Sequence, residues 1–364
     1  MTSPIIREKL DAHLRDIIAI HFDAKSGAPY WIEKAAALRL DAIQSIRGID
    51  DLALLGPMDS AALAQRPLEY FVPRGFGDQK SRWIVAETGG TLGRPRFAVH
   101  REDEFQAGFV TPFVLAAQRA GFPRELNWLF IGPSGPHIIG KAARACASAL
   151  GSMDPFSVDF DPRWARKLPD QSAGRTRYLA HLEAQALNVL NTQNVGVLFA
   201  TPPVLASLGG KIEPERRALI RGIHFGGMAV SAALRAKLSE LFPNAVQLSG
   251  YGNTLFGVTP ELSFSAKTGI DYFPHGLRLC YRLMPREIAD ECTRISQSVP
   301  MGERGQVLVH RLDETQFIAN MIERDTAIRV APPEDAAIDG FVLEGLRDPQ
   351  PIVDDEIQPA LGLY

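Results

Sequence analysis

The sequence is poor in cysteine, has little net charge and lacks long apolar runs, and each of these shortages excludes a class of function. Its only cysteines, Cys146, Cys280 and Cys292, lie far apart with no C-x-x-C pair, so neither a disulfide framework nor a zinc site is indicated. A net charge of −3 provides no basic excess for nucleic acid and no acidic tail. No apolar run reaches membrane-spanning length, and the N-terminus lacks a signal-peptide pattern. We therefore expect a cytoplasmic protein that binds neither nucleic acid nor membranes.

What is present is the composition of an ordinary globular protein, with 46% hydrophobic and 22% charged residues. Its 364 residues can bury one large core or two domains. Short apolar strands, each followed by a loop, are expected at residues 127–131, 195–200, 222–225 and 246–249. Helices follow most of these loops. Repeated strand–loop–helix units predict an α/β fold with a mostly parallel sheet and helices on both of its faces.

Beyond Pro260 the pattern changes to strands with few helices between them. We expect these strands at residues 270–273, 277–283 and 307–312 and around Ile328. The predicted division is an α/β core over residues 1–260, a smaller β-rich subdomain of the same core over residues 261–345, and a hinge remnant with a tail over residues 346–364.

Within the core, residues 86–96 have the composition of a phosphate-binding loop. Its glycines, threonines and arginines are Thr88, Gly89, Gly90, Thr91, Gly93, Arg94 and Arg96. Glycines let the backbone come close to a ligand, hydroxyls and free N–H groups cradle an anion, and guanidinium groups suit phosphate oxygens. Short apolar strands flank the loop on both sides, whereas Walker and Rossmann loops open into a helix. Taken alone, the stretch is equally consistent with an ordinary surface turn.

This loop resembles the phosphate loop of the adenylate-forming superfamily of acyl-CoA ligases, aryl-CoA ligases and luciferases, which reads roughly T/S-G-G-T-T-G-x-P-K. Leu92 replaces the second threonine, and arginine replaces the lysine. Three more stretches match in the expected order: 225–230 resembles G-G-E-P-L, 250–254 resembles Y-G-x-T-E, and 302–309 resembles G-E-x-G-E-L. The likeness is strongest to phenylacetate–CoA ligase-like enzymes and to short adenylases of phenazine antibiotic biosynthesis that lack the C-terminal domain.

The resemblance implies ATP-dependent activation of a carboxylic acid as an acyl-adenylate, with ATP and Mg²⁺ as cofactors. The implied catalytic residues are Thr88, Thr91, Arg94 and Thr254. The implied nucleotide-binding residues are Gly89, Gly90, Gly93, Gly226, Gly227, Met228, Tyr251, Gly252, Asn253 and Asp325, with Tyr251 stacking on adenine. The acid is expected near His137, Phe225, Ser249 and Gly250, and the apolar surroundings suit an aromatic acid, a phenazine carboxylate included. For His137 a structural hydrogen bond is an open alternative.

Two departures concern single residues. Leu255 stands where the family places a glutamate that helps to hold Mg²⁺, and leucine cannot bind a hard cation. Glu261 or Asp271 could substitute, or ATP phosphates and water could hold the metal. Ala327 stands at the family's ribose-binding aspartate, so Asp325, two residues earlier, is the candidate ribose ligand. A salt bridge or a helix cap is the alternative role for Asp325.

The third departure concerns the C-terminal lid domain of the family. Residues 345–348 resemble a remnant of the hinge that precedes this domain, and the sequence ends at Tyr364. Without a lid to exclude water we expect slow adenylation, with the acyl group passed to a partner enzyme or a thiol carrier. The resemblance also implies a homodimer. Two alternatives are a catalytically degenerate relative that binds the acid or the nucleotide, and an acyl-CoA ligase whose C-terminal domain is supplied in trans.

Overall fold

The computed structural model describes residues 3–89, 94–169, 171–228 and 230–352. Its helical segments are α1 (Pro4–Phe22), α2 (Pro29–Leu38), α3 (Ala42–Ser45), η1 (Ile49–Leu55), α4 (Ala62–Gln65), η2 (Leu68–Tyr70), η3 (Arg74–Arg82), α5 (Glu102–Phe105), η4 (Gln106–Val110), α6 (Thr111–Ala120), α7 (Ile138–Ala149), α8 (Pro162–Lys167), α9 (Ala173–Thr192), α10 (Pro202–Gly209), α11 (Pro214–Arg217), α12 (Ala232–Leu241), α13 (Glu291–Ile295) and η5 (Glu334–Asp339). Here η4 is a π-helix, and the other η segments are 3₁₀ helices.

The strands are β1 (Ile84–Glu87), β2 (Phe97–His100), β3 (Asn127–Ile131), β4 (Phe156–Val158), β5 (Val195–Phe199), β6 (Gly222–Gly226), β7 (Val246–Asn253), β8 (Gly257–Ser265), β9 (Gly269–Tyr272), β10 (Leu279–Met284), β11 (Arg304–Leu312), β12 (Phe317–Val330) and β13 (Gly345–Pro351). Strands β1 and β2 form a two-stranded sheet. The others form one sheet in the order β10-β11-β12-β13-β9-β8-β7-β6-β5-β3-β4.

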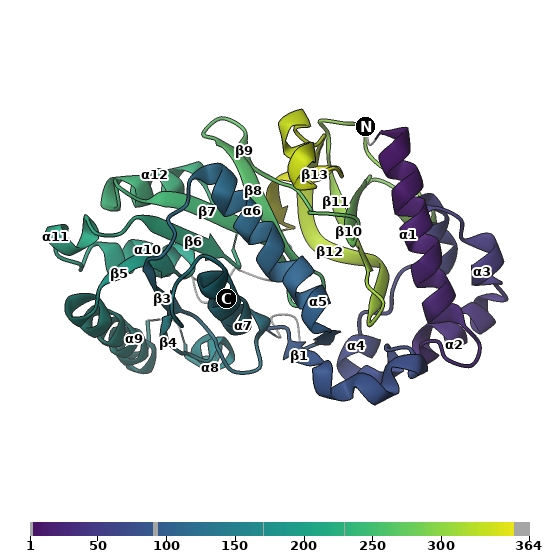
Figure 1. The fold of residues 1–364 in the computed structure, drawn as a ribbon, viewed down its shortest axis with the longest axis horizontal. Coiled ribbons are helices and arrows are strands. Elements are labelled where there is room, and N and C mark those ends of the chain that lie inside the picture. Colours follow the sequence, from purple (N-terminus) through teal and green to yellow (C-terminus); the bar gives the residue numbers. More distant parts are fainter. Residues whose placement is uncertain (1–2, 90–93, 170, 229, 353–364) are drawn as a thin grey trace.

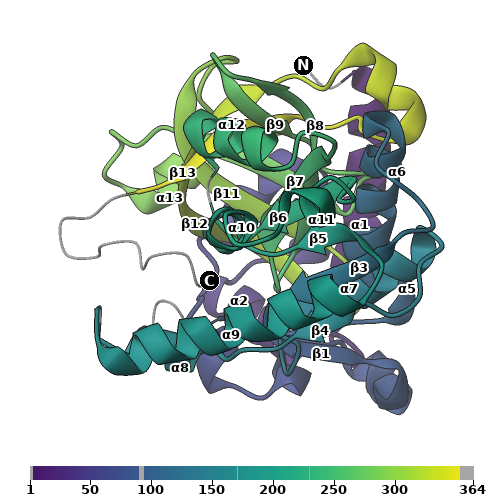
Figure 2. The same ribbon diagram turned by 90° about the vertical axis from the view of Figure 1, so that its left-hand side faces the viewer.

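One half of the large sheet is parallel, as the strand–loop–helix units predict. Strands β4, β3, β5, β6 and β7 are parallel neighbours. Helices α9, α10 and α12 cover one face of this half, and α6 and α7 cover the other (Figures 1 and 2). Neighbouring residues of a strand point to opposite faces, so Leu198 of β5 packs with the first group of helices and Phe199 with the second. The mixed α/β fold is therefore confirmed.

The other half of the sheet is antiparallel and begins at the pair β7–β8. Residues 250–253, which the sequence pattern reads as loop, extend β7 and pair with β8. Pro260 looks like a break in the sequence, yet it lies inside β8 opposite Gly250. Residues 345–348, interpreted from the sequence as a remnant of the hinge, belong to β13, which lies between β12 and β9.

The N-terminal helices pack on the antiparallel half of the sheet. Leu14 and Trp31 share a buried cluster with Val307 and Phe317, and Trp31 Nε1 donates a hydrogen bond to the Phe317 carbonyl at 3.1 Å. Figure 1 shows α1 to α3 beside β10 to β12, at the opposite end of the molecule from α9 to α11. A boundary at residue 260 stays a prediction. Within the described chain, no helix combines the length and apolar character that crossing a membrane requires.

Candidate active site

A cavity of about 570 Å³ lies where several distant segments meet. Its walls come from the β1–β2 hairpin, the chain around α4, the start of α7, the ends of β5 and β6, the β7–β8 hairpin and β12. The carboxyl ends of β6 and β7 border it, which is where ligands bind in α/β sheets. The predicted site residues on its wall are Thr88, Gly89, Arg94, His137, Gly226, Gly227, Gly250, Gly252, Asn253 and Thr254. The structure therefore gathers most of the predicted constellation in one place.

Five other predicted residues are described but do not line the cavity. The side chains of Phe225 and Ser249 are on the opposite face of the sheet from His224 and Gly250, because strand residues alternate. Phe225 is fully buried in the cluster under α9 to α12, and Ser249 Oγ is 2.7 Å from the Tyr272 hydroxyl. The expectation that they contact the acid has no support in this geometry. The remaining three are Met228, Tyr251 and Asp325; Gly90, Thr91 and Gly93 lie outside the described residues.

Tyr251 and Asp325 contact each other, although they were predicted for separate parts of the nucleotide. The Tyr251 hydroxyl donates to Asp325 Oδ2 at 2.7 Å. Burial, followed by the nearby Asp325 and Glu323 carboxyls, raises the pKa of Tyr251 well above its usual value. Burial also raises the pKa of Asp325, while the bond from Tyr251 opposes that shift. The stacking and ribose-binding roles of this pair stay predictions.

The phosphate loop is closed at its base by a two-way contact between Thr88 and Arg96. Thr88 N donates to the Arg96 carbonyl at 2.9 Å, and Arg96 N donates to Thr88 Oγ1 at 3.0 Å. The guanidinium of Arg96 reaches across to Ser60 Oγ at 3.4 Å. Thr254 Oγ1 donates to the carbonyl of Glu87, the residue before the loop, at 3.3 Å. Strand β1 and the β7–β8 hairpin thus hold the polar end of the cavity together.

Glu323 of β12 also lies on the cavity wall, and sequence reasoning missed it. Asn253 Nδ2 donates to Glu323 Oε1 at 3.5 Å. Burial and the neighbouring Asp325 raise the pKa of Glu323 to about 7, while Arg96 and the bond from Asn253 act in the opposite direction. Glu323 is two residues before Asp325, the predicted ribose ligand, and alternation along a strand could have suggested that both side chains share a face.

The structure limits which residues can hold Mg²⁺. Leu255 is fully buried in an apolar cluster. Glu261 pairs with Arg235 at 2.6 Å and Asp271 with Arg347 at 2.8 Å, and neither carboxylate lines the cavity. In the described ranges, no three His, Cys, Asp or Glu side chains form a metal cluster. Mg²⁺ commonly takes one or two carboxylates with substrate phosphates and water, and Glu323 supplies one at the polar end.

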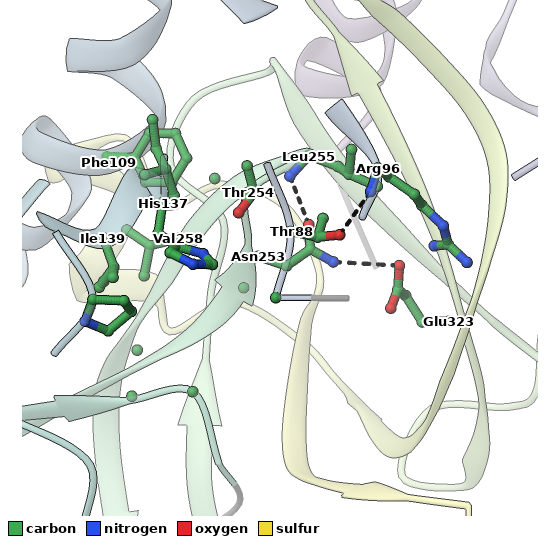
Figure 3. Close-up of a pocket in the computed structure, with 18 of the residues that line it drawn as sticks. Thr88, Arg96, Phe109, His137, Ile139, Asn253, Thr254, Leu255, Val258 and Glu323 are labelled. Carbon is green, nitrogen blue, oxygen red and sulfur yellow. Dashed lines mark hydrogen bonds between the residues drawn. The ribbon is translucent and has the colours of Figure 1, made fainter. Parts of the chain in front are cut away.

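The opposite end of the cavity is apolar. Figure 3 shows Phe109, His137, Ile139 and Val258 gathered on one side, and Thr88, Arg96, Asn253 and Glu323 on the other. Thr254 lies between the two groups. Phe109 comes from the π-helix η4, a distortion that is frequent at functional sites. His137 is the residue before α7, at its N-cap position.

His224 of β6 is a second histidine of the cavity wall that sequence reasoning missed. Its Nδ1 is 2.8 Å from the Leu248 carbonyl, and its ring packs against Phe199 and Phe113, with centroids 4.3 and 4.6 Å away. Burial lowers its pKa to about 4, so the ring is neutral at pH 7. A carbonyl oxygen only accepts hydrogen bonds, so the proton of this neutral ring is on Nδ1.

Comparisons with protein families and with curated proteins find no match to the sequence. The fold, however, is similar to solved structures of 2-hydroxyisobutyryl-CoA ligase. The complex with 2-HIB-AMP and CoA in the thioesterification state has a TM-score of 0.66 at 16% identity, covering 97% of this chain and 69% of that chain. The postadenylation state with R3-HIB-AMP gives 0.68 at 13% identity, covering 99% and 70%. An open conformation with 2-HIB-AMP and CoA gives 0.66 at 14% identity, covering 99% and 78%. This chain therefore has the fold of the adenylate-forming ligases.

Proposed function

We propose that this chain activates a carboxylic acid with ATP, forming an acyl-adenylate and releasing pyrophosphate. The observation that carries the proposal is the two-ended cavity. A cationic, hydroxyl-bearing end with Thr88, Arg94 and Arg96 suits a polyphosphate, and an apolar end suits the organic part of an acid. Thr254 lies between them, where the carboxylate and the α-phosphate would meet. The ligase fold supports the same reading.

In this reaction a carboxylate oxygen attacks the α-phosphorus, a new O–P bond forms, and the bond from that phosphorus to the bridging oxygen of pyrophosphate breaks. Catalysis of such a transfer is mainly positioning and stabilisation of charge on the phosphoryl oxygens. Arg94 and Arg96 would hold the phosphate oxygens, and the Thr254 hydroxyl would contact the α-phosphate. Mg²⁺ bound with ATP and held by Glu323 would neutralise phosphate charge.

The finer proposals concern the acid, the acceptor and the assembly. The aromatic rings of Phe109 and Phe199 on the cavity wall favour a planar acid such as an aryl or phenazine carboxylate. We propose further that the acyl group passes to a thiol or to a partner enzyme, and that the protein forms a homodimer.

The test is ATP–pyrophosphate exchange with the purified protein and a panel of aromatic and aliphatic acids. Exchange that depends on one class of acid is the expected result. Replacing Arg96 with glutamine should reduce the exchange rate by about 10-fold or more while acid binding, followed by calorimetry, persists. No exchange with any acid from protein that binds ATP would overturn the proposal.

A second candidate is a relative that binds the acid or the nucleotide without catalysis. The buried, apolar Leu255 at the family's metal-ligand position favours it. A non-catalytic relative predicts saturable acid binding in calorimetry, no ATP–pyrophosphate exchange, and no effect of the Arg96 substitution on acid affinity. Exchange and binding measured on the same preparation therefore separate the two candidates.

A further inference from the structure

His224 differs from the other buried histidines in what surrounds its second ring nitrogen. In His21, His100 and His310 one ring nitrogen is hydrogen-bonded, and the other is completely enclosed without a partner. In His224 the Nδ1 atom is bonded to the Leu248 carbonyl, but Nε2 is not among the enclosed atoms. Across residues 3–352, apart from the gaps in the description, no residue bonds to Nε2. Nε2 therefore reaches open space, and the open space beside this ring is the cavity.

The position of the ring within the cavity follows from its neighbours. A β-carbon added at Gly250 would lie 3.8 Å from His224 Cε1 and 2.6 Å from Val258 Cγ2, so these three residues form one wall. Val258 belongs to the apolar end, on the side away from Thr88 and Arg96 (Figure 3). His224 therefore faces the part of the cavity proposed for the body of the acid.

The chemistry of Nε2 is restricted by the bond at Nδ1. Since Nδ1 keeps the proton, Nε2 presents a lone pair and can only accept a hydrogen bond. It cannot bind a carboxylate, which is also an acceptor, so the acid must turn its carboxylate toward Thr254 and the arginines. Phe109, Ile139 and Val258 at this end of the cavity offer no hydrogen-bond donor, so the Nε2 acceptor loses its partner when the ligand that displaces water also offers none.

We infer that the acid bears a hydroxyl or amino group that donates to His224 Nε2, so that the substrate class is hydroxy- or amino-substituted carboxylic acids. The inference rests on the proposed function and specifies its substrate. A site built to accept from a substrate hydroxyl discriminates strongly against the analogue that lacks it, whereas an apolar pocket tells such pairs apart weakly.

The experiment compares acids that differ only in the donor. Exchange rates are measured with benzoate, the three hydroxybenzoates, the three aminobenzoates and the three methoxybenzoates, and with 3-hydroxybutyrate against butyrate. At least one hydroxy or amino acid should exceed both its unsubstituted parent and its methoxy counterpart in kcat/KM by about 10-fold or more. The methoxy acids carry an oxygen without a proton, so they separate hydrogen-bond donation from size.

Two variants assign the preference to the residue. In His224→Asn the amide nitrogen can take the place of Nδ1 against the Leu248 carbonyl, but nothing replaces Nε2. The ratio of kcat/KM for the hydroxy or amino acid to kcat/KM for its unsubstituted parent should therefore fall toward one. The exposed His181 of α9 supplies the matched control, because His181→Asn should leave the ratio unchanged. Equal rates for donor and parent acids across the panel, or an unchanged ratio in His224→Asn, would overturn the inference.

A spectroscopic measurement keeps the test decisive if the variant does not fold or no exchange is seen. In ¹⁵N-labelled wild-type protein, the His224 Nε2 resonance should move upfield when a hydroxy acid binds and stay in place when its methoxy counterpart binds. Binding of both acids without that difference overturns the inference, as does binding of none. Loss of exchange with every acid, but with the Nε2 shift present, would instead count against the proposed function alone.

If His224→Asn changes the discrimination between ATP and ITP and not between acids, the group that donates to Nε2 is the adenine amino group and the inference is wrong.

Discussion

Arg311 donates from Nη2 to the backbone carbonyl of Val99 at 2.8 Å, and its guanidinium is completely buried. The same group donates from Nη1 to the Leu255 carbonyl at 2.9 Å and from Nε to Asp313 at 2.6 Å. Val99 lies in the strand that leaves the phosphate loop, and Leu255 directly follows Thr254. One buried cation of β11 thus fixes both segments that carry the proposed phosphate contacts.

Replacing Arg311 with methionine should therefore destabilise the whole protein and not only the site. The change keeps much of the apolar volume but leaves two carbonyls and part of the Asp313 carboxylate without partners. Removing one member of a buried ion pair costs about 3–5 kcal/mol. Urea unfolding followed by circular dichroism measures the loss.

Arg144 provides the matched control for that substitution. It pairs with Asp154 at 2.9 Å, but both side chains are mostly exposed. Exposed pairs contribute about 0–1 kcal/mol, so Arg144→Met should change the free energy of unfolding by no more than that. Similar losses in the two variants would contradict the anchoring role of Arg311.

Two glycines of β7 should respond differently to alanine. At Gly252 an added β-carbon would lie 2.0 Å from the Gly257 carbonyl oxygen, and backbone cannot yield in a paired hairpin. We expect Gly252→Ala to lose about 3 kcal/mol or more in free energy of unfolding. At Gly250 the nearest atom is Val258 Cγ2 at 2.6 Å, a side-chain methyl that can move only if Val258 changes its χ1 rotamer, whereas at Gly252 the obstacle is backbone.

Gly250→Ala should therefore stay folded but take space from the acid. The expected readout is an increase of about 10-fold in the KM for the acid, with a much smaller change in the KM for ATP, since one methyl group in a pocket changes discrimination by roughly 10- to 200-fold. Equal changes in both constants would show that the hairpin, and not the acid pocket, is affected.

The sequence predicted the parallel strands and the order of the motifs because periodic apolar runs and glycine-rich loops are local signals. It did not indicate which face of β6 and β7 borders the cavity. That choice depends on the helices that pack on each side, so Phe225 and Ser249 were predicted for the site and His224 was missed. Glu323 was missed for a related reason: its contact with Asn253 joins β12 to β7, and these strands are not neighbours in the sheet, so no local pattern indicates that they meet.

Stability should fall as the pH drops from 7 toward 5. Burial lowers the pKa of His21 and His310 to about 3 and that of His224 to about 4. In the unfolded chain these residues titrate near 6.5, so below that pH the unfolded state binds protons that the folded state does not. Each such proton reduces stability by about 1.4 kcal/mol per pH unit until the pH reaches the folded pKa.

Buried carboxyls act in the opposite direction over part of this range. Burial and Asp325 raise the pKa of Glu323 to about 7 in the folded state. As the pH falls, Glu323 therefore takes up its proton in the folded state before it does so in the unfolded state, and this uptake raises the free energy of unfolding. Three histidines outweigh it between pH 6.5 and 5. Urea midpoints at pH 7, 6 and 5 test the balance, and a flat or rising free energy of unfolding would show that the histidines are not buried as described.

Glu323→Gln should weaken metal binding in the ATP complex more than it weakens the fold. Glutamine keeps an oxygen that can accept from Asn253 but removes the carboxylate that faces the polar end of the cavity. Mn²⁺ affinity, followed by electron paramagnetic resonance with ATP present, should fall by at least about 10-fold, the lower limit found when even an outer-sphere partner is removed. Glu240→Gln is the matched control, because Glu240 is an exposed carboxyl of α12 that does not line the cavity. If the two variants bind Mn²⁺ equally well, Glu323 is not a metal ligand, and the ATP phosphates hold the ion without it.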